Sequence, residues 1–200
     1  AMMGALGLLA KVVEGRGGQV DVAMYDVMLS QLNYLAGAWL NAGERSQRFA
    51  RSAHPYIVPA QLFATKDGWL ALFITHDDFW KRFCNEVGRP EWLEDERFAT
   101  MSARRENREV VIAAIGALFA ERETEHWVGR LAPLGVVVAG VETLEDALAS
   151  DVARAREMVV SIPTDAGTIR AVGNPIKTQG EASRYAPLPL LGEHNAVLLG

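Results

Sequence analysis

The stretch EGRGGQVDVAMYD at residues 14–26 decides how the amino-terminal part of the chain is interpreted. A glycine cluster beside a basic residue cradles phosphate when it follows a strand and opens a helix, because backbone N–H groups then point at the anion. Here the order is reversed, since alternating residues follow Gly18 and an apolar run at helical spacing precedes Gly15. The stretch therefore predicts a helix ending at a left-handed Gly15, a turn, and a strand over residues 20–24. The helical positions are Met3, Leu6, Leu9, Ala10 and Val13.

The composition of the 200 residues is typical of a globular protein, because half of them are apolar and can form a core. The 25 acidic residues outnumber the 20 basic ones, and the basic residues are scattered, so no nucleic-acid surface is expected. The apolar runs fall short of the roughly 18 to 20 residues that a membrane span needs, and no basic-apolar leader is recognisable. We therefore expect a cytoplasmic protein with no membrane contact.

The single cysteine, Cys84, cannot form an internal disulfide, and no Cys/His spacing suits zinc, so we expect a reducing compartment and no metal. Cys84 lies among Phe79, Trp80 and Phe83 on an expected helix. This setting favours a buried, inert thiol over a nucleophile.

The middle of the chain shows a change of character that predicts a domain crossing. A second helix-compatible run over 25–41 ends at Gly43, and the polar, basic segment 44–53 reads as a linker or mobile loop. A β-hairpin then follows over 62–74, with Asp67-Gly68 expected to supply the positive φ of a tight turn. Thr75 is expected to cap a helix through Val87.

The remaining elements alternate between helices and short strands. Helices are expected over 102–120 and 124–134, with apolar residues facing the core from Val111 to Leu131. An apolar strand over 136–138, a helix capped by Thr143 and a short helix over 151–156 come next. A second hairpin, 158–162 with 168–172, turns around residues 165–167, and a terminal helix ends the chain. This order of elements predicts an α/β fold.

Six segments, in order, closely resemble the second half of the CaiB/BaiF family of class III CoA-transferases. They are SAHPYIVPAQLFATKDGWLAL, RPEWLEDERFATMSARRENR, LAPLGVVVAGVETLEDAL, AREMVV, VGNPIK and LGEHN. The opening stretch is also similar to the family pattern TGRGQxVDVAMxD, with Gly18 where the family usually has Gln. The resemblance implies the CoA-transferase family III fold, here incomplete: part of a Rossmann-like large domain plus a small α+β domain.

The resemblance also implies a domain layout. Residues 1–50 are expected to be the remainder of the large CoA-binding domain, and 51–160 the small α+β domain. Residues 161–200 are expected to form the hairpin and the return to the large domain.

Family members attack the thioester of an acyl-CoA with an aspartate, which forms an anhydride and releases the CoA thiolate. The alignment places that aspartate upstream of Ala1, so no catalytic residue is assigned within these 200 residues. A substitute carboxylate would need a water-excluding pocket with oxyanion donors. Asp21 on a short strand and Asp26 at a helix start are instead interpreted as solvated or capping residues.

The resemblance implies two groups of binding residues. Met24, His76, Asp77 and Asp78 align with positions that contact coenzyme A, although Met24 fits a core residue equally well, and capping alone is the favoured interpretation of the 76–78 segment. Two acids at a helix start would repel phosphates, so contact with adenosine or pantetheine is expected.

The second group lies in the linker and concerns the acid substrate. Alignment places Arg51, Ser52 and Ala53 where formyl-CoA transferases carry a mobile glycine-rich loop, which argues against an oxalate/formate specialisation. Arg51 could pair with a substrate carboxylate, and His54 could carry protons with the upstream aspartate, although a solvated Arg and a turn His fit these positions as well.

Three functional hypotheses follow. The first is an acyl-CoA:carboxylate CoA-transferase, here a fragment, acting on a CoA thioester and a carboxylic acid without a covalently bound cofactor. The second is an α-methylacyl-CoA racemase-like enzyme using a His/Asp pair, and the third a non-catalytic dimerisation or acyl-CoA-binding remnant. The family forms interlocked dimers, and the faces of Met3, Leu6, Leu9 and Leu32 are expected to be exposed here, so a homodimer is expected.

Overall fold

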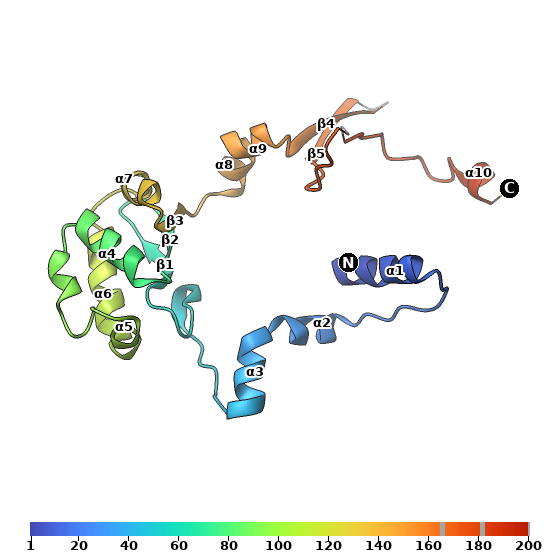
Figure 1. The fold of residues 1–200 in the computed structure, drawn as a ribbon. Coiled ribbons are helices and arrows are strands. Elements are labelled where there is room, and N and C mark those ends of the chain that lie inside the picture. Colours follow the sequence, from blue (N-terminus) through green and yellow to red (C-terminus); the bar gives the residue numbers. More distant parts are fainter. Residues whose placement is uncertain (165–166, 181–182, 200) are drawn as a thin grey trace. The chain divides into compact units, whose positions relative to one another are not determined.

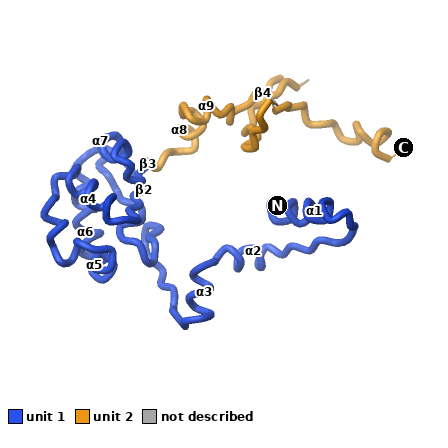
Figure 2. Tube along the Cα trace, viewed as in Figure 1, with its two compact units in different colours: residues 1–139 blue, residues 140–200 orange. Residues whose placement is uncertain are grey.

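The computed structural model describes residues 1–164, 167–180 and 183–199. The chain forms two compact units, Ala1–Ala139 and Gly140–Gly200, drawn in different colours in Figure 2. Mixed helices and short strands confirm the α/β class, and the elements are labelled in Figure 1. No described helix is both long enough and apolar enough to cross a membrane.

Three helices begin the first unit: α1 (Met2–Glu14), α2 (Met24–Gln31) and α3 (Asn33–Ala42). Gly15 ends α1 at φ 65° and Gly43 ends α3 at φ 68°, which confirms both predicted helix stops. None of the three helices contains a buried residue. Their apolar faces are therefore uncovered in this chain.

Two predictions for this part are wrong. Residues 20–23 form no strand, because no neighbouring strand pairs with them, and Met24 is already the first residue of α2. The single helix expected over 25–41 is divided between α2 and α3 at Asn33, whose φ is 45°. A positive φ at a non-glycine residue breaks the regular helical geometry there.

The core of the first unit lies within residues 58–136. An antiparallel hairpin, β1 (Ala60–Ala64) with β2 (Trp69–Phe73), is joined by β3 (Val137–Gly140) in the order β1-β2-β3. The helices α4 (Asp77–Glu86), α5 (Met101–Glu106), α6 (Arg108–Phe119) and α7 (Thr124–Leu131) lie beside this sheet in Figure 1. Three 3₁₀ turns, η1 (Ala50–Ser52), η2 (Pro90–Leu93) and η3 (Ala132–Leu134), complete the unit.

Aromatic and branched side chains fill this core in the predicted pattern. The expected core-facing residues of α6 and α7 are all buried: Val111, Ile115, Leu118, Phe119, Trp127 and Leu131. Cys84 is fully buried beside them, and burial raises the pKa of its thiol to about 12. The prediction of a buried thiol is therefore confirmed, and burial disfavours the nucleophilic thiolate.

Three local predictions need correction. The hairpin is present, but Asp67 and Gly68 lack a positive φ: the turn is held by Thr65, which donates from N to Gly68 O and accepts from Gly68 N at Oγ1. Thr75 does not cap α4, because its hydroxyl hydrogen-bonds to His76 Nδ1 and the N-cap is His76 itself. The helix over 102–120 is interrupted at Asn107, whose Nδ2 donates to Ala103 O at the end of α5.

The second unit contains α8 (Leu144–Ala149), α9 (Asp151–Ala155), β4 (Val159–Thr164), β5 (Gly167–Val172) and α10 (Asn195–Leu198). The predicted Thr143 cap is confirmed, since its Oγ1 accepts from Asp146 N at 3.2 Å. The second hairpin is confirmed in the register Val159↔Val172, while the turn expected at residues 165–167 falls mostly outside the described residues.

Candidate functional site

The linker segment Arg51–Ala53 adopts a tight, specific backbone. Arg51 and Ser52 both have left-handed φ angles, 56° and 55°, and Ala53 N donates to Ala50 O. The Arg51 guanidinium lies 5.5 Å from the ring centroid of Trp69, in a cation–π arrangement. Glycine takes such φ angles without strain, so the segment holds non-glycine residues in a backbone that favours glycine.

His54 organises the turn that follows. Its Nδ1 accepts hydrogen bonds from Tyr56 N and Ile57 N, both at 3.1 Å, and its Nε2 lies 2.9 Å from Tyr34 Oη. Two N–H donors on Nδ1 place the ring proton on Nε2, which donates to Tyr34. Burial and the nearby Arg108 charge lower the pKa of His54, which favours this neutral form. His54 is thus a turn residue with both ring nitrogens engaged.

Aromatic rings connect α3 to the His54 turn. Tyr34 stacks on His54 with ring centroids 5.8 Å apart, and Tyr56 and Phe73 approach the imidazole edge-on. Tyr56 Oη donates to Glu44 Oε2 at 3.1 Å, and this hydrogen bond raises the pKa of Tyr56. These contacts hold the linker against Phe73 at the end of β2.

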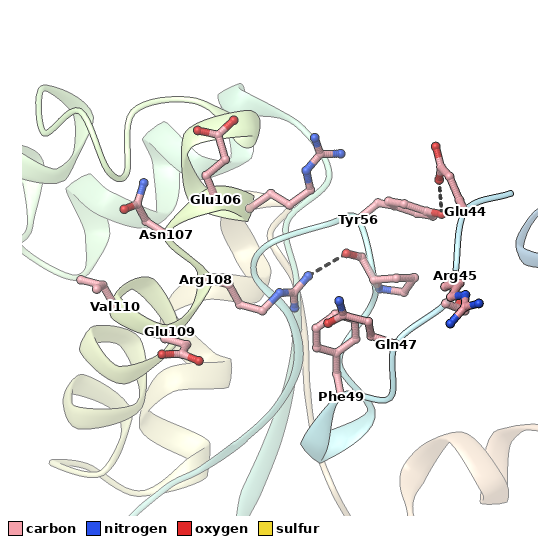
Figure 3. Close-up of a pocket in the computed structure, with 13 residues that line it drawn as sticks. Glu44, Arg45, Gln47, Phe49, Tyr56, Glu106, Asn107, Arg108, Glu109 and Val110 are labelled. Carbon is pink, nitrogen blue, oxygen red and sulfur yellow. Dashed lines mark hydrogen bonds between the residues drawn. The ribbon is translucent and has the colours of Figure 1, made fainter. Parts of the chain in front are cut away.

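A pocket of about 670 Å³ lies between this linker and the corner where α5 meets α6. Figure 3 shows Tyr56 and Phe49 on the linker side, with Asn107 and Arg108 on the helical side. The pocket carries both charge signs: its lining includes Arg45, Arg105 and Arg108 together with Glu44, Glu106 and Glu109. Its volume is that of a small-molecule site.

The segment His76–Asp78 begins α4 and is exposed. Asp77 Oδ1 accepts a 3.0 Å hydrogen bond from Nη2 of Arg104, whose side chain is fully buried. Arg104 also donates to Val58 O and Phe98 O, and its guanidinium lies 4.7 Å from the Trp80 ring centroid. The position of the 76–78 segment is therefore set by a cation in the core.

The expected acid-binding residues lie together in the structure, whereas Met24 does not have the environment that the sequence predicted for it. Arg51 to His54 form one continuous turn, and His54 packs against Phe73 near the end of β2. Met24 is 87% exposed at the start of α2, so its interpretation as a strand residue in the core is wrong. The contacts with coenzyme A and with the acid expected for these residues stay predictions.

Sequence reasoning missed four participating residues: Tyr34, Tyr56, Arg104 and Arg108. The spacing of the two arginines, four residues apart in ARRENR, was a signal, because such residues lie on neighbouring turns of a helix and can reach the same packing layer. For the tyrosines there was no local signal, since Tyr34 meets His54 across 20 residues.

The sequence pattern of CoA-transferase family III matches residues 1–195, nearly the whole chain. The chain belongs to this family. It is 31% identical over 197 residues to an acyl-CoA transferase of Fusarium pseudograminearum, covering 96% of this chain and 43% of the relative. It is 32% identical over 199 residues to a succinate–glutarate CoA-transferase of Agrobacterium fabrum, covering 96% of this chain and 48% of that relative.

Solved structures agree with this assignment. The crystal structure of Rv3272 from M. tuberculosis matches with a TM-score of 0.78 and 25% identity, covering 96% of this chain and 51% of that one. A CaiB/BaiF family protein from Brucella suis matches with a TM-score of 0.74 and 27% identity, covering 96% and 50%. The family expected from the sequence motifs and its fold are confirmed. The chain spans about half the length of the relatives it matches.

Proposed function

We propose that this chain forms part of an acyl-CoA:carboxylate CoA-transferase, which moves CoA from an acyl-CoA donor to a small organic acid. The family match over residues 1–195 carries the proposal. Relatives in the family are named for such reactions, including the acetyl-CoA:oxalate CoA-transferase of Acetobacter aceti and the succinate–glutarate enzyme of Agrobacterium fabrum. The CoA thioester is a substrate in this proposal, and the proposed compartment is the cytoplasm.

The attacking carboxylate is proposed to come from outside these 200 residues. A carboxylate that attacks a thioester must sit in a water-excluding pocket beside oxyanion donors. The candidates in this chain do not meet that condition: Asp21 and Asp26 are exposed, and the Asp77 side chain is 65% exposed and bound to Arg104. These residues are better suited to solvation, helix starts and packing.

The two residue groups keep distinct proposed roles. His76, Asp77 and Asp78 are proposed to contact the adenosine or pantetheine part of CoA together with Met24, because acids at a helix start disfavour phosphates. Arg51 to His54 are proposed to face the acid. His54 is better suited to positioning than to proton transfer, since Tyr34 and two backbone N–H groups already occupy its ring nitrogens.

The assembly and domain layout extend the proposal. Met3, Leu6 and Leu9 are 39%, 59% and 58% exposed, and Leu32 is 46% exposed. Apolar faces of this kind are usually covered by a partner or by further chain, which supports the proposed homodimer. The proposed large domain comprises residues 1–50 and 161–200, and residues 51–160 form the proposed small domain.

CoA transfer tests the proposal directly. The longest in-frame product of the gene is incubated with acetyl-CoA or succinyl-CoA and a panel of carboxylic acids, and new acyl-CoA species are followed by mass spectrometry. Formation of a new thioester dependent on the acid is expected. A parallel reaction in deuterated water distinguishes the racemase alternative, because a racemase exchanges the α-hydrogen without an acceptor acid. Absence of both reactions across the panel would contradict the proposal and favour a non-catalytic remnant.

A further inference from the structure

Arg108 is a partly buried cation whose hydrogen-bond partners are neutral. Its Nη2 donates to His54 O at 2.8 Å and to Pro55 O at 2.9 Å, and its guanidinium carbon lies 4.3 Å from the Phe49 ring centroid. Burial lowers the pKa of Arg108. Desolvating a charge is unfavourable unless an opposite charge compensates it. Arg108 is thus oriented on both sides but has no anionic partner among the described residues.

Arg104, four residues earlier in the last turn of α5, provides a contrast. It is also oriented by backbone carbonyls and an aromatic ring, but its Nη2 reaches the Asp77 carboxylate at 3.0 Å. The two arginines therefore share a mode of attachment and differ in one component. Arg108 has no carboxylate partner of this kind in the part of the chain that the structure describes, and its side chain lines the 670 Å³ pocket.

None of the three glutamates that line the pocket is paired with Arg108. Glu44 accepts from Tyr56 Oη at 3.1 Å, and Glu106 accepts from Ser102 Oγ at 3.2 Å. Figure 3 shows Glu109 pointing away from the Arg108 guanidinium. The Nε and Nη1 groups of Arg108 make no hydrogen bond with any residue that the structure describes. Each of these groups can donate a charge-assisted hydrogen bond to a carboxylate, but they lie on opposite edges of the guanidinium, since both of its two-donor edges include Nη2.

We propose that this pocket binds the carboxylate of a small organic acid, with Arg108 as its anchor. The carboxylate accepts a single charge-assisted hydrogen bond from Nη1 or Nε of Arg108, and the hydrocarbon part of the acid packs on Phe49, Pro55 and Val110 in the pocket wall. The negative charges of the three glutamates that line the pocket balance the positive charges of its three arginines. A singly charged carboxylate therefore fits better than a phosphate, whose second charge these acids would repel.

Only the identity of the acid in the cell rests on the proposed function, where it would be a substrate or product of CoA transfer. The binding itself does not depend on catalysis. A pocket that binds carboxylates in a protein without CoA transfer would leave this inference standing, whereas CoA transfer without carboxylate binding at Arg108 would contradict it alone.

Calorimetric titration with butanoate tests the inference. Butyramide serves as the neutral analogue of the same shape, and inorganic phosphate tests the other anion class. We expect butanoate to bind, butyramide and phosphate to bind at least about tenfold more weakly, and Arg108→Gln to weaken butanoate by a similar factor, as loss of a charge-assisted pair predicts. Arg122→Gln, an exposed arginine of the same unit that does not line the pocket, is the matched control and should bind like wild type.

A second readout covers the case in which Arg108→Gln disturbs the linker. In the wild-type protein, the NMR signal of the Arg108 Nε–H group should shift on titration with butanoate, and the corresponding signal of Arg122 should not. Equal binding of butanoate and butyramide, tighter binding of phosphate, or an unmoved Arg108 signal at saturating butanoate would each overturn the inference.

Discussion

The buried guanidinium of Arg104 donates a 3.0 Å hydrogen bond to Asp77, and the two side chains are 0% and 65% exposed. The pair joins the last turn of α5 to the start of α4, where the proposed CoA-contacting segment lies. Because its cation is desolvated and its anion is not, the two partners contribute differently to stability. Comparing the stability lost on substituting each partner therefore tests whether the buried Arg104 holds the 76–78 segment in place.

Arg104→Ala is expected to lower the free energy of unfolding by about 3 kcal/mol or more, because it removes a large buried side chain and leaves buried carbonyls without donors. Asp77→Asn is expected to cost at most about 1 kcal/mol, since solvent screens an exposed partner. Urea denaturation measures both, with Asp78→Asn, in the same helical turn, as the control. Equal losses for Arg104→Ala and Asp77→Asn would contradict this assignment.

The stability that His54 contributes is expected to decrease at acidic pH. Its pKa is lowered in the folded protein by burial and by Arg108, so the unfolded chain binds a proton more readily. Its contribution to stability is therefore fully present above the ordinary histidine pKa of 6.5 and is lost as the pH falls below that value. His54→Gln should flatten the decrease in urea midpoint between neutral and mildly acidic pH. His126→Gln, on the exposed side of α7, should leave the decrease unchanged, and a wild-type slope in His54→Gln would refute the prediction.

The left-handed φ of Ser52 is expected to destabilise the folded protein, because serine adopts this backbone conformation less readily than glycine. Ser52→Gly is expected to raise the free energy of unfolding by up to about 1 kcal/mol, because relief of strain exceeds the added entropy of the unfolded chain. Ser52→Val should lower it by about 1 kcal/mol or more, since a branched side chain tolerates this φ poorly. Ser46→Gly, in the same linker but without a positive φ, should not stabilise. Thermal unfolding distinguishes these outcomes, and stabilisation by Ser46→Gly but not Ser52→Gly would contradict the account.

The helix stops and the core could be predicted from the sequence because they depend on local chemistry. Gly15 and Gly43 end helices for a reason contained in the residue itself, and the apolar spacing of α6 places Ile115 and Phe119 inward wherever the helix packs. The family could also be recognised, because its motifs recur in order along nearly the whole chain.

The failures arose where distant residues decide the outcome. Val20 to Ala23 have strand-like sequence but no strand partner in the described part of the chain, and a strand requires one. Thr75 fits a cap by its position, yet the adjacent His76 takes its hydroxyl. The pairing of Tyr34 with His54 and of Arg104 with Asp77 joins segments 20 and 27 residues apart, which local patterns do not encode.

The uncovered face of α1 predicts association of the 200-residue chain. Light scattering after size exclusion should give a dimer or a larger species, because Leu6 and Leu9 are more than half exposed on one helix. Leu6→Glu with Leu9→Glu should reduce the mass toward that of one chain, 21.8 kDa, and Lys11→Glu on the same helix should not. A single species at 21.8 kDa for the unmodified chain would overturn the prediction.

The central claim is that the proposed CoA-transferase uses a carboxylate outside residues 1–200, and a trapping experiment tests it most directly. The 200-residue chain is incubated with acyl-CoA and hydroxylamine, which converts an activated aspartyl group to a hydroxamate, and peptides are analysed by mass spectrometry. The account predicts that Asp21, Asp26 and Asp77 remain unmodified, while the longest in-frame gene product is modified at an aspartate upstream of Ala1. A hydroxamate on Asp21, Asp26 or Asp77 would contradict it and identify that residue as the nucleophile.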